Sequence, residues 1–173
     1  FTVSKLGYFV IDSYDGLIEE IVRVKPRVIK SGSPGFLKQL RDALGDNYGT
    51  ILIGRDFGQI DDMARWDGGR ILTDPLGAAA YWVSAYRQAM GLVPGVYWES
   101  ANEMSNFSWM PQYGLFEAER VRLMHEEGFL ACIGNFSVGN PPIRPDTNDP
   151  WEHFYPALEA ADKYGAVLGL HEY

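Results

Sequence analysis

The sequence contains few of the residues from which disulfide bonds and metal sites are built. Cys132 is the only cysteine, so no disulfide can form within the chain. Because Cys132 lies in the apolar run 129–133, we expect a buried, unreactive thiol. The three histidines form neither an H-x-H nor an H-E-x-x-H pattern. We therefore predict no catalytic metal and no organic cofactor.

Long apolar runs and clustered positive charge are also absent. No run approaches the roughly 20 apolar residues that span a membrane. The net charge is −8 and the 15 basic residues are scattered, whereas a nucleic-acid surface needs a clustered positive patch. We predict neither a membrane nor a nucleic acid as a partner. The chain begins at Phe1 without a basic-then-apolar signal segment, so we expect that a leader has been removed or that the sequence is incomplete.

Apolar runs of strand length alternate with stretches of helix length along the whole chain. With 173 residues, of which 46% are hydrophobic, the chain is long enough for one domain with an ordinary core. The predicted strands cover residues 6–11, 27–30, 50–53, 92–96, 129–134 and 166–170. The predicted helices cover residues 14–24, 34–44, 75–90, 115–127 and 150–164, and a longer loop is expected over 56–70.

Three of the predicted helices begin with the same signal, a serine or aspartate followed by proline. A serine or aspartate side chain can accept a hydrogen bond from an amide of the first turn, and proline suits the first helical position. The three pairs are Ser33-Pro34, Asp74-Pro75 and Asp149-Pro150. The expected helix ends are Gly45, Gly91, Gly128 and Gly165.

This alternation predicts parallel strands joined by right-handed helical crossovers. Two architectures fit it: a (β/α) barrel of TIM type that is truncated after its sixth strand, and an open doubly wound α/β sheet. A doubly wound nucleotide binder usually has a glycine-rich loop after its first strand, but residues 12–16 read DSYDG. We therefore favour the barrel, with residues 1–173 as a single catalytic-type domain that is incomplete at its C-terminus. A complete barrel would need about 80 more residues.

The segment 97–103, with the sequence YWESANE, is the clearest functional signal. It follows the fourth predicted strand, and in a barrel the carboxyl ends of the strands carry the chemistry. A carboxyl group there, beside an amide and among aromatic rings, suits a proton donor to a glycosidic oxygen. We expect Glu103 to be this acid and Asn102 to bind a sugar 2-hydroxyl. If the strand continues without a bulge, Glu99, Ala101 and Glu103 share one face.

Other polar and aromatic residues are expected near the same end of the sheet. Arg55 follows the third strand, and we leave open whether it binds a substrate hydroxyl or forms an ordinary salt bridge. The same two readings apply to Asp12, and Glu99 has a second one as a polar group inside the barrel. Loop aromatics can act as sugar platforms or pack over the barrel mouth; they are Trp66, Trp109 and Tyr113. Two amides past the fifth strand can contact substrate or form turns; they are Asn135 and Asn140.

Two motifs resemble those of clan A glycoside hydrolases. Residues 98–103 are similar to the W-E-x-x-N-E signature at the end of the fourth strand in that clan, and residues 171–173 are similar to its H-x-Y at the end of the sixth. The resemblance implies a retaining O-glycoside hydrolase with Glu103 as general acid/base. It also implies that His171 lines the sugar site and that Tyr173 bonds the nucleophile. The expected substrate contacts are therefore Arg55, Trp98, Glu99, Asn102, Trp109, Asn135, His171 and Tyr173.

The chain departs from that pattern in two ways. Met104 stands where the clan usually has proline, and the clan's nucleophile belongs to a seventh strand that this sequence does not contain. The nucleophile is therefore expected outside this chain. Two other readings remain open: a non-catalytic carbohydrate-binding or assembly module, which would self-associate or be part of a longer chain, and an open-sheet protein of unrelated chemistry. The compartment stays undecided, and secretion follows only by analogy with proteins that act on polysaccharides.

Overall fold

The computed structural model describes residues 7–45, 49–55, 68–104, 107–141 and 149–170, and these form an α/β fold. One sheet contains all the strands of this part of the chain. They are β1 Gly7–Val10, β2 Val28–Ser31, β3 Ile51–Gly54, β4 Val96–Glu99, β5 Leu130–Phe136 and β6 Val167–Leu170. Each strand pairs in parallel with the next, so that the order in the sheet follows the order in the chain.

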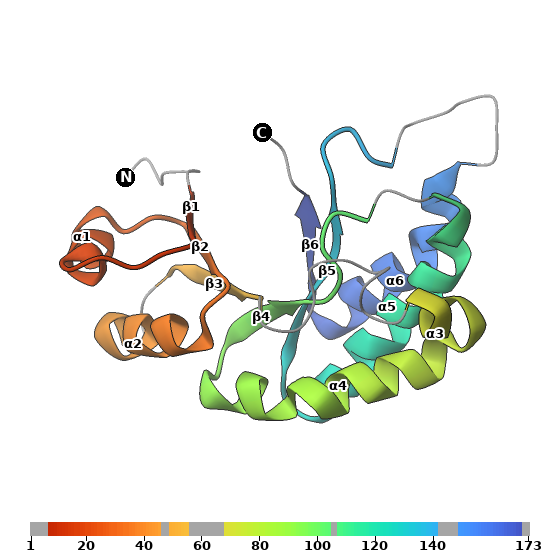
Figure 1. Cartoon of the computed structure of the whole chain (residues 1–173), viewed down its shortest axis with the longest axis horizontal. Coiled ribbons are helices and arrows are strands. Elements are labelled where there is room, and N and C mark those ends of the chain that lie inside the picture. The colour runs from red at the N-terminus through yellow and green to blue at the C-terminus, as the bar shows by residue number, and fades with distance from the viewer. Residues whose placement is uncertain (1–6, 46–48, 56–67, 105–106, 142–148, 171–173) are drawn as a thin grey trace.

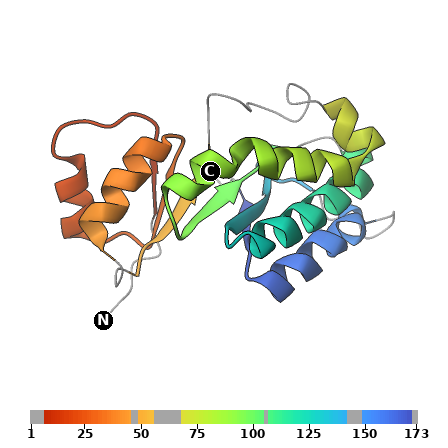
Figure 2. The ribbon, with the colours of Figure 1, turned by 90° about the horizontal axis from the view of Figure 1, so that it is seen from below.

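The sheet is curled like half of a barrel, and the helices lie along its outer side (Figures 1 and 2). The predicted α/β class with parallel strands is confirmed, and the curl is compatible with both architectures considered above. The α-helices of the described residues are α1 Leu17–Val24, α2 Pro34–Leu44, α3 Gly68–Thr73, α4 Pro75–Leu92, α5 Met110–Glu126 and α6 Pro150–Tyr164. A short 3₁₀ helix, η1 Phe107–Trp109, precedes α5.

The three predicted helix starts are confirmed. The side chains of Ser33, Asp74 and Asp149 each accept a hydrogen bond from an amide of the following turn, at 3.2, 3.0 and 3.0 Å. A proline occupies the first turn of each helix. Caps could be predicted because they depend only on residues that are adjacent in the sequence.

The predicted start of the fourth strand is wrong. Leu92 is the last residue of α4, and β4 begins only at Val96. Pro94 and Gly95 form a turn between them, with Gly95 at a φ of 73°. This pair favours a turn more strongly than the surrounding apolar residues favour a strand. The correction moves Tyr97 and Glu99 into the strand and leaves Asn102–Glu103 in the segment after its carboxyl end.

The loops before α4 and α5 are shorter than predicted. Residues 68–73 form the short helix α3. It was not predicted, because the two glycines at its start disfavour a helix. Helix α5 begins at Met110 instead of residue 115, so Tyr113 lies inside a helix and is fully buried. The prediction that Tyr113 belongs to a loop is therefore wrong. Likewise, β5 extends to Phe136, so that Asn135 lies within the strand and not past it.

The core lies between the sheet and the helices. Ile29, Leu52 and Val96 are neighbours in register on β2, β3 and β4, and all are buried with the helical apolar residues. The adjacent register row, Lys30, Ile53 and Tyr97, is only half-buried and faces the inside of the curl. Since strand side chains alternate, this inner side also carries the polar groups described next.

Candidate functional site

Glu103 lies past the carboxyl end of β4 with its side chain exposed. Its neighbours Ala101 and Met104 are buried, and Met104 forms an isolated parallel bridge with Phe136 of β5. The segment therefore lies beside the end of β5. Its extended alternation stops at Glu99, so the expected common face of Glu99, Ala101 and Glu103 does not continue to Glu103.

Glu103 has a left-handed backbone, with a φ of 51°. Asn135, at the end of the neighbouring strand, has a φ of 48°, and the only other such non-glycine residue among those described is Lys25. This conformation is uncommon for residues with a side chain and is enriched at functional sites. At Asn135 it coincides with a register shift between β5 and β6.

Two buried amide atoms at these strand ends have no hydrogen-bond partner within the described part of the chain. They are the Asn102 Oδ1 acceptor and the Asn135 Nδ2 donor. The Cys132 thiol donates to Asn135 Oδ1 at 3.5 Å. Buried polar groups are normally paired, so these two atoms are exceptions to the usual pattern.

A buried ionic cluster joins β2, β3 and β4 on the inside of the curl. Lys30 Nζ is 2.8 Å from Glu99 Oε1, and Arg55 Nη2 is 2.7 Å from Glu99 Oε2. Arg55 Nε also donates to Glu99 Oε2, at 2.8 Å. Burial lowers the pKa of Lys30, and the charge of Arg55 lowers it further, against the opposing effect of Glu99. Both oxygens of Glu99 are thus engaged, which favours its interpretation as a polar group inside the curl.

The other predicted site residues lie in different surroundings. Trp98 is buried in the core, where a Cβ on Gly54 would lie 2.6 Å from its ring. Trp109 is half-buried at the end of η1 and packs against the core. Asn140 donates to Ser137 Oγ at 2.7 Å and to the Val138 carbonyl at 3.1 Å, which is turn chemistry. The predictions for Trp66, His171 and Tyr173 concern positions outside the described residues.

A buried network beneath this site was missed by the sequence analysis. Glu117 Oε1 accepts hydrogen bonds from Ser100 Oγ at 2.5 Å and from Tyr113 at 2.9 Å. Glu117 Oε2 accepts from Arg120 Nε at 2.7 Å, and all four side chains are buried. Burial raises the pKa of Tyr113 well above its ordinary value, and the Glu117 charge adds to this. The one available signal was a pair of opposite charges, three residues apart, within an apolar helix face.

Cys132 is buried as predicted, and burial raises the pKa of its thiol well above the ordinary value. His125 and His153 are exposed. Within the described residues, no group of three or more His, Cys, Asp or Glu could hold a metal ion. No helix in the same part of the chain is long and apolar enough to cross a membrane.

Comparison with known proteins assigns no family. No protein-family model matches the sequence, and no curated protein matches it. The function must therefore be argued from the residues and their geometry.

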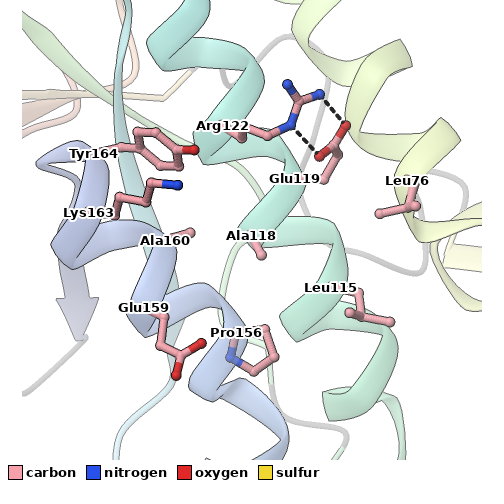
Figure 3. A pocket seen from close by; sticks show the side chains of 10 residues that line it. All are labelled: Leu76, Leu115, Ala118, Glu119, Arg122, Pro156, Glu159, Ala160, Lys163 and Tyr164. Atoms are coloured by element: carbon pink, nitrogen blue, oxygen red, sulfur yellow. Dashed lines mark hydrogen bonds and ion pairs between the residues drawn. The ribbon is translucent and has the colours of Figure 1, made fainter.

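A groove of about 310 Å³ lies between α5 and α6, next to the start of α4 (Figure 3). Its floor includes Ala118, Ala160 and Pro156, and the ion pair Arg122–Glu119, at 2.7 Å, lies at its side. It includes none of the predicted site residues. A second hollow, of about 360 Å³, runs along the outer edge of β1.

Proposed function

We propose that the chain is a domain of a retaining O-glycoside hydrolase in which Glu103 is the general acid/base. The observation that carries the proposal is the position of Asn102–Glu103, in the segment that follows the fourth of six parallel strands, which succeed one another in order. The carboxyl ends of such strands are where barrel enzymes carry their catalytic residues. Glu103 is an exposed residue there.

The strand order supports a barrel-type arrangement of the described strands. In a doubly wound sheet the order reverses at a switch point, where ligands bind. Every described strand here pairs with its successor, without a reversal. Helices on one side of a curled sheet also agree with the outer ring of a barrel.

The proposed reaction has two steps. In the first, the Glu103 carboxyl gives its proton to the glycosidic oxygen while a carboxylate outside this chain attacks the anomeric carbon, and the bond to the leaving group breaks. In the second, Glu103 accepts a proton from the water that attacks the glycosyl-enzyme, which releases the sugar and the carboxylate. Asn102 would hydrogen-bond the sugar 2-hydroxyl, while the Lys30–Glu99–Arg55 cluster holds the ends of three strands together.

The test replaces Glu103 by glutamine in the full-length protein. Because glutamine cannot donate the proton, we expect turnover of methyl glycosides, whose leaving group is poor, to fall about 10²–10⁴-fold. Glycosylation by 4-nitrophenyl glycosides should suffer less, because 4-nitrophenolate leaves without protonation. Azide should speed the second step, since it attacks without a base.

The matched control is Glu152→Gln, an exposed carboxylate in the first turn of α6. It should leave both activities unchanged. Equal and near-parental activity of Glu103→Gln on both substrate types would refute the assignment of Glu103.

A second candidate is a non-catalytic carbohydrate-binding or assembly module. It is favoured by the apolar side chains exposed on both outer strands of the described sheet, Phe9 on β1 and Leu168 and Leu170 on β6. Under this alternative, Glu103→Gln would bind glycans as the parent does, and no glycoside would be hydrolysed by either protein.

A further inference from the structure

Helix α5 is tied to β4, near its carboxyl end, and to β5 by one buried network. Arg120 Nη1 donates to the Trp98 carbonyl of β4 at 3.1 Å, and Arg120 Nη2 donates to the Cys132 carbonyl of β5 at 2.8 Å. Arg120 also lies over the ring of Trp82, with its guanidinium carbon 4.7 Å from the ring centre. These contacts fix the position of the Arg120 guanidinium independently of its contact with Glu117.

Glu117 links Arg120 to the segment that follows β4. Its Oε1 accepts from the Ser100 hydroxyl, the first residue after β4, and from the Tyr113 hydroxyl. Tyr113 also lies within 2.9 Å of the Gly134 carbonyl oxygen. Ser100 precedes Glu103 by three residues, and Gly134 directly precedes Asn135. The contacts thus reach the chain just before each of the two left-handed residues.

A left-handed glutamate needs such support. The conformation costs roughly 1–2 kcal/mol for a residue with a Cβ, so a segment without anchors would relax from it. Met104 provides one anchor after Glu103, through its burial and its bridge to Phe136. Ser100, held by Glu117, provides the anchor before it.

We propose that Glu117 is a positioning residue that, through Ser100, fixes the backbone from which the Glu103 carboxyl is presented. The role in catalysis rests on the function proposed above, whereas the role in ordering Glu103 does not. Glu117 touches no reacting atom in this scheme. Its two oxygens suit the task, because one accepts from Arg120 while the other accepts from two hydroxyl groups.

The first experiment measures backbone order and needs no substrate. In the full-length protein, ¹⁵N relaxation should give the Glu103 amide an order parameter near the value of about 0.85 for rigid backbone. Ser100→Ala removes the hydroxyl but keeps Glu117 paired with Arg120. This variant should lower the order parameter of the Glu103 amide below about 0.6. Ser84→Ala, at an exposed position of α4, is the matched control and should change nothing.

The second experiment uses a panel of methyl and 4-nitrophenyl β-glycosides. If Ser100→Ala misplaces the Glu103 carboxyl, kcat on methyl glycosides should fall about tenfold or more, with KM changed little. Activity on 4-nitrophenyl glycosides should be nearly kept, because that leaving group needs no acid. A purely structural loss would instead lower both activities in parallel.

A double-mutant cycle identifies Glu117 as the partner of Ser100. If Ser100 acts through Glu117, Ser100→Ala combined with Glu117→Gln should lower the order parameter no further than Glu117→Gln alone. Should Glu117→Gln fail to fold, Ser100→Ala alone decides the matter.

A Glu103 amide that stays rigid in Ser100→Ala overturns the positioning role. Loss of order in a protein that hydrolyses none of the glycosides overturns the proposed function and leaves the ordering role intact.

Discussion

At the scale of single residues, the candidate site is marked by backbone conformation more than by burial. Glu103 is an exposed glutamate in a left-handed conformation that glycine would adopt without strain. A glutamate in this conformation lowers the stability of the folded protein. This agrees with a side chain that is kept for its chemistry. Asn135 shows the milder form of the same effect, since asparagine tolerates this conformation better than most residues.

The strain at Glu103 can be measured by two substitutions. Glu103→Gly should be more stable than Glu103→Ala by about 1 kcal/mol, because only glycine adopts a positive φ without a penalty. Lys25, at a φ of 54° in the C-cap of α1, provides the matched control, and its glycine and alanine variants should differ by a similar amount. Urea unfolding measures both pairs, and equal stability of the two Glu103 variants would contradict the strain.

Sequence patterns located the ends of the strands better than the contacts made there. Asn102 and Glu103 were placed correctly after the fourth strand, because a strand followed by a polar loop is a local pattern. Glu117 and Arg120 were not found, because their partners Ser100 and Trp98 lie about 20 residues away in the sequence. Burial of a helix's charged residues depends on what packs against the helix, which no local pattern reveals.

At the scale of elements, helix starts were predictable and the boundaries that depend on packing were not. Ser33, Asp74 and Asp149 cap helices through bonds to amides two or three residues away. Helix α5 starts earlier than predicted because Tyr113, which was expected in a loop, packs in the core against Phe136 and Phe154. Propensity alone did not favour a helix here, because Gly114 lies early in it.

Two glycines in neighbouring helices should respond to alanine in opposite ways. A Cβ on Gly114 of α5 would lie 2.3 Å from the His153 carbonyl oxygen of α6. This oxygen belongs to the backbone, which cannot move without a cost in stability. Gly114→Ala should therefore destabilise the fold by about 1–3 kcal/mol. Gly91, near the end of α4, has nothing within 4 Å of its missing Cβ, and Gly91→Ala should stabilise the protein by about 0.5–1 kcal/mol. Thermal unfolding of both variants measures this, and a stable Gly114→Ala would contradict the close packing of α5 and α6.

At the scale of the whole molecule, the outer strands β1 and β6 are the two edges of the described sheet. Phe9 on β1 and Ile11 just after it are 51% and 65% exposed, and Leu168 and Leu170 on β6 are 41% and 45% exposed. Apolar side chains beside unpaired strand edges favour association with further strands. The alternation of elements predicted a parallel sheet, but closure depends on contacts between distant strands and could not be predicted from it.

The 173-residue chain alone should therefore associate in a concentration-dependent way. Sedimentation should show species heavier than 19.4 kDa, and Leu168→Lys combined with Leu170→Lys should shift them towards the monomer. Leu92→Lys is the matched control, because Leu92 is similarly exposed at the end of α4, away from both edges. A parent chain that is monomeric at every concentration would contradict the prediction.

The order of the strands also has a consequence for how the protein is made. Because each strand pairs only with those before and after it in the chain, a newly made strand–helix unit can be added to the unit already formed. Each pairing joins neighbouring units of the chain, so its loop-closure entropy cost is smaller than for a pairing between distant strands. We expect the sheet to grow from β1 during synthesis on the ribosome, with the most recent strand always exposed as the template for the next.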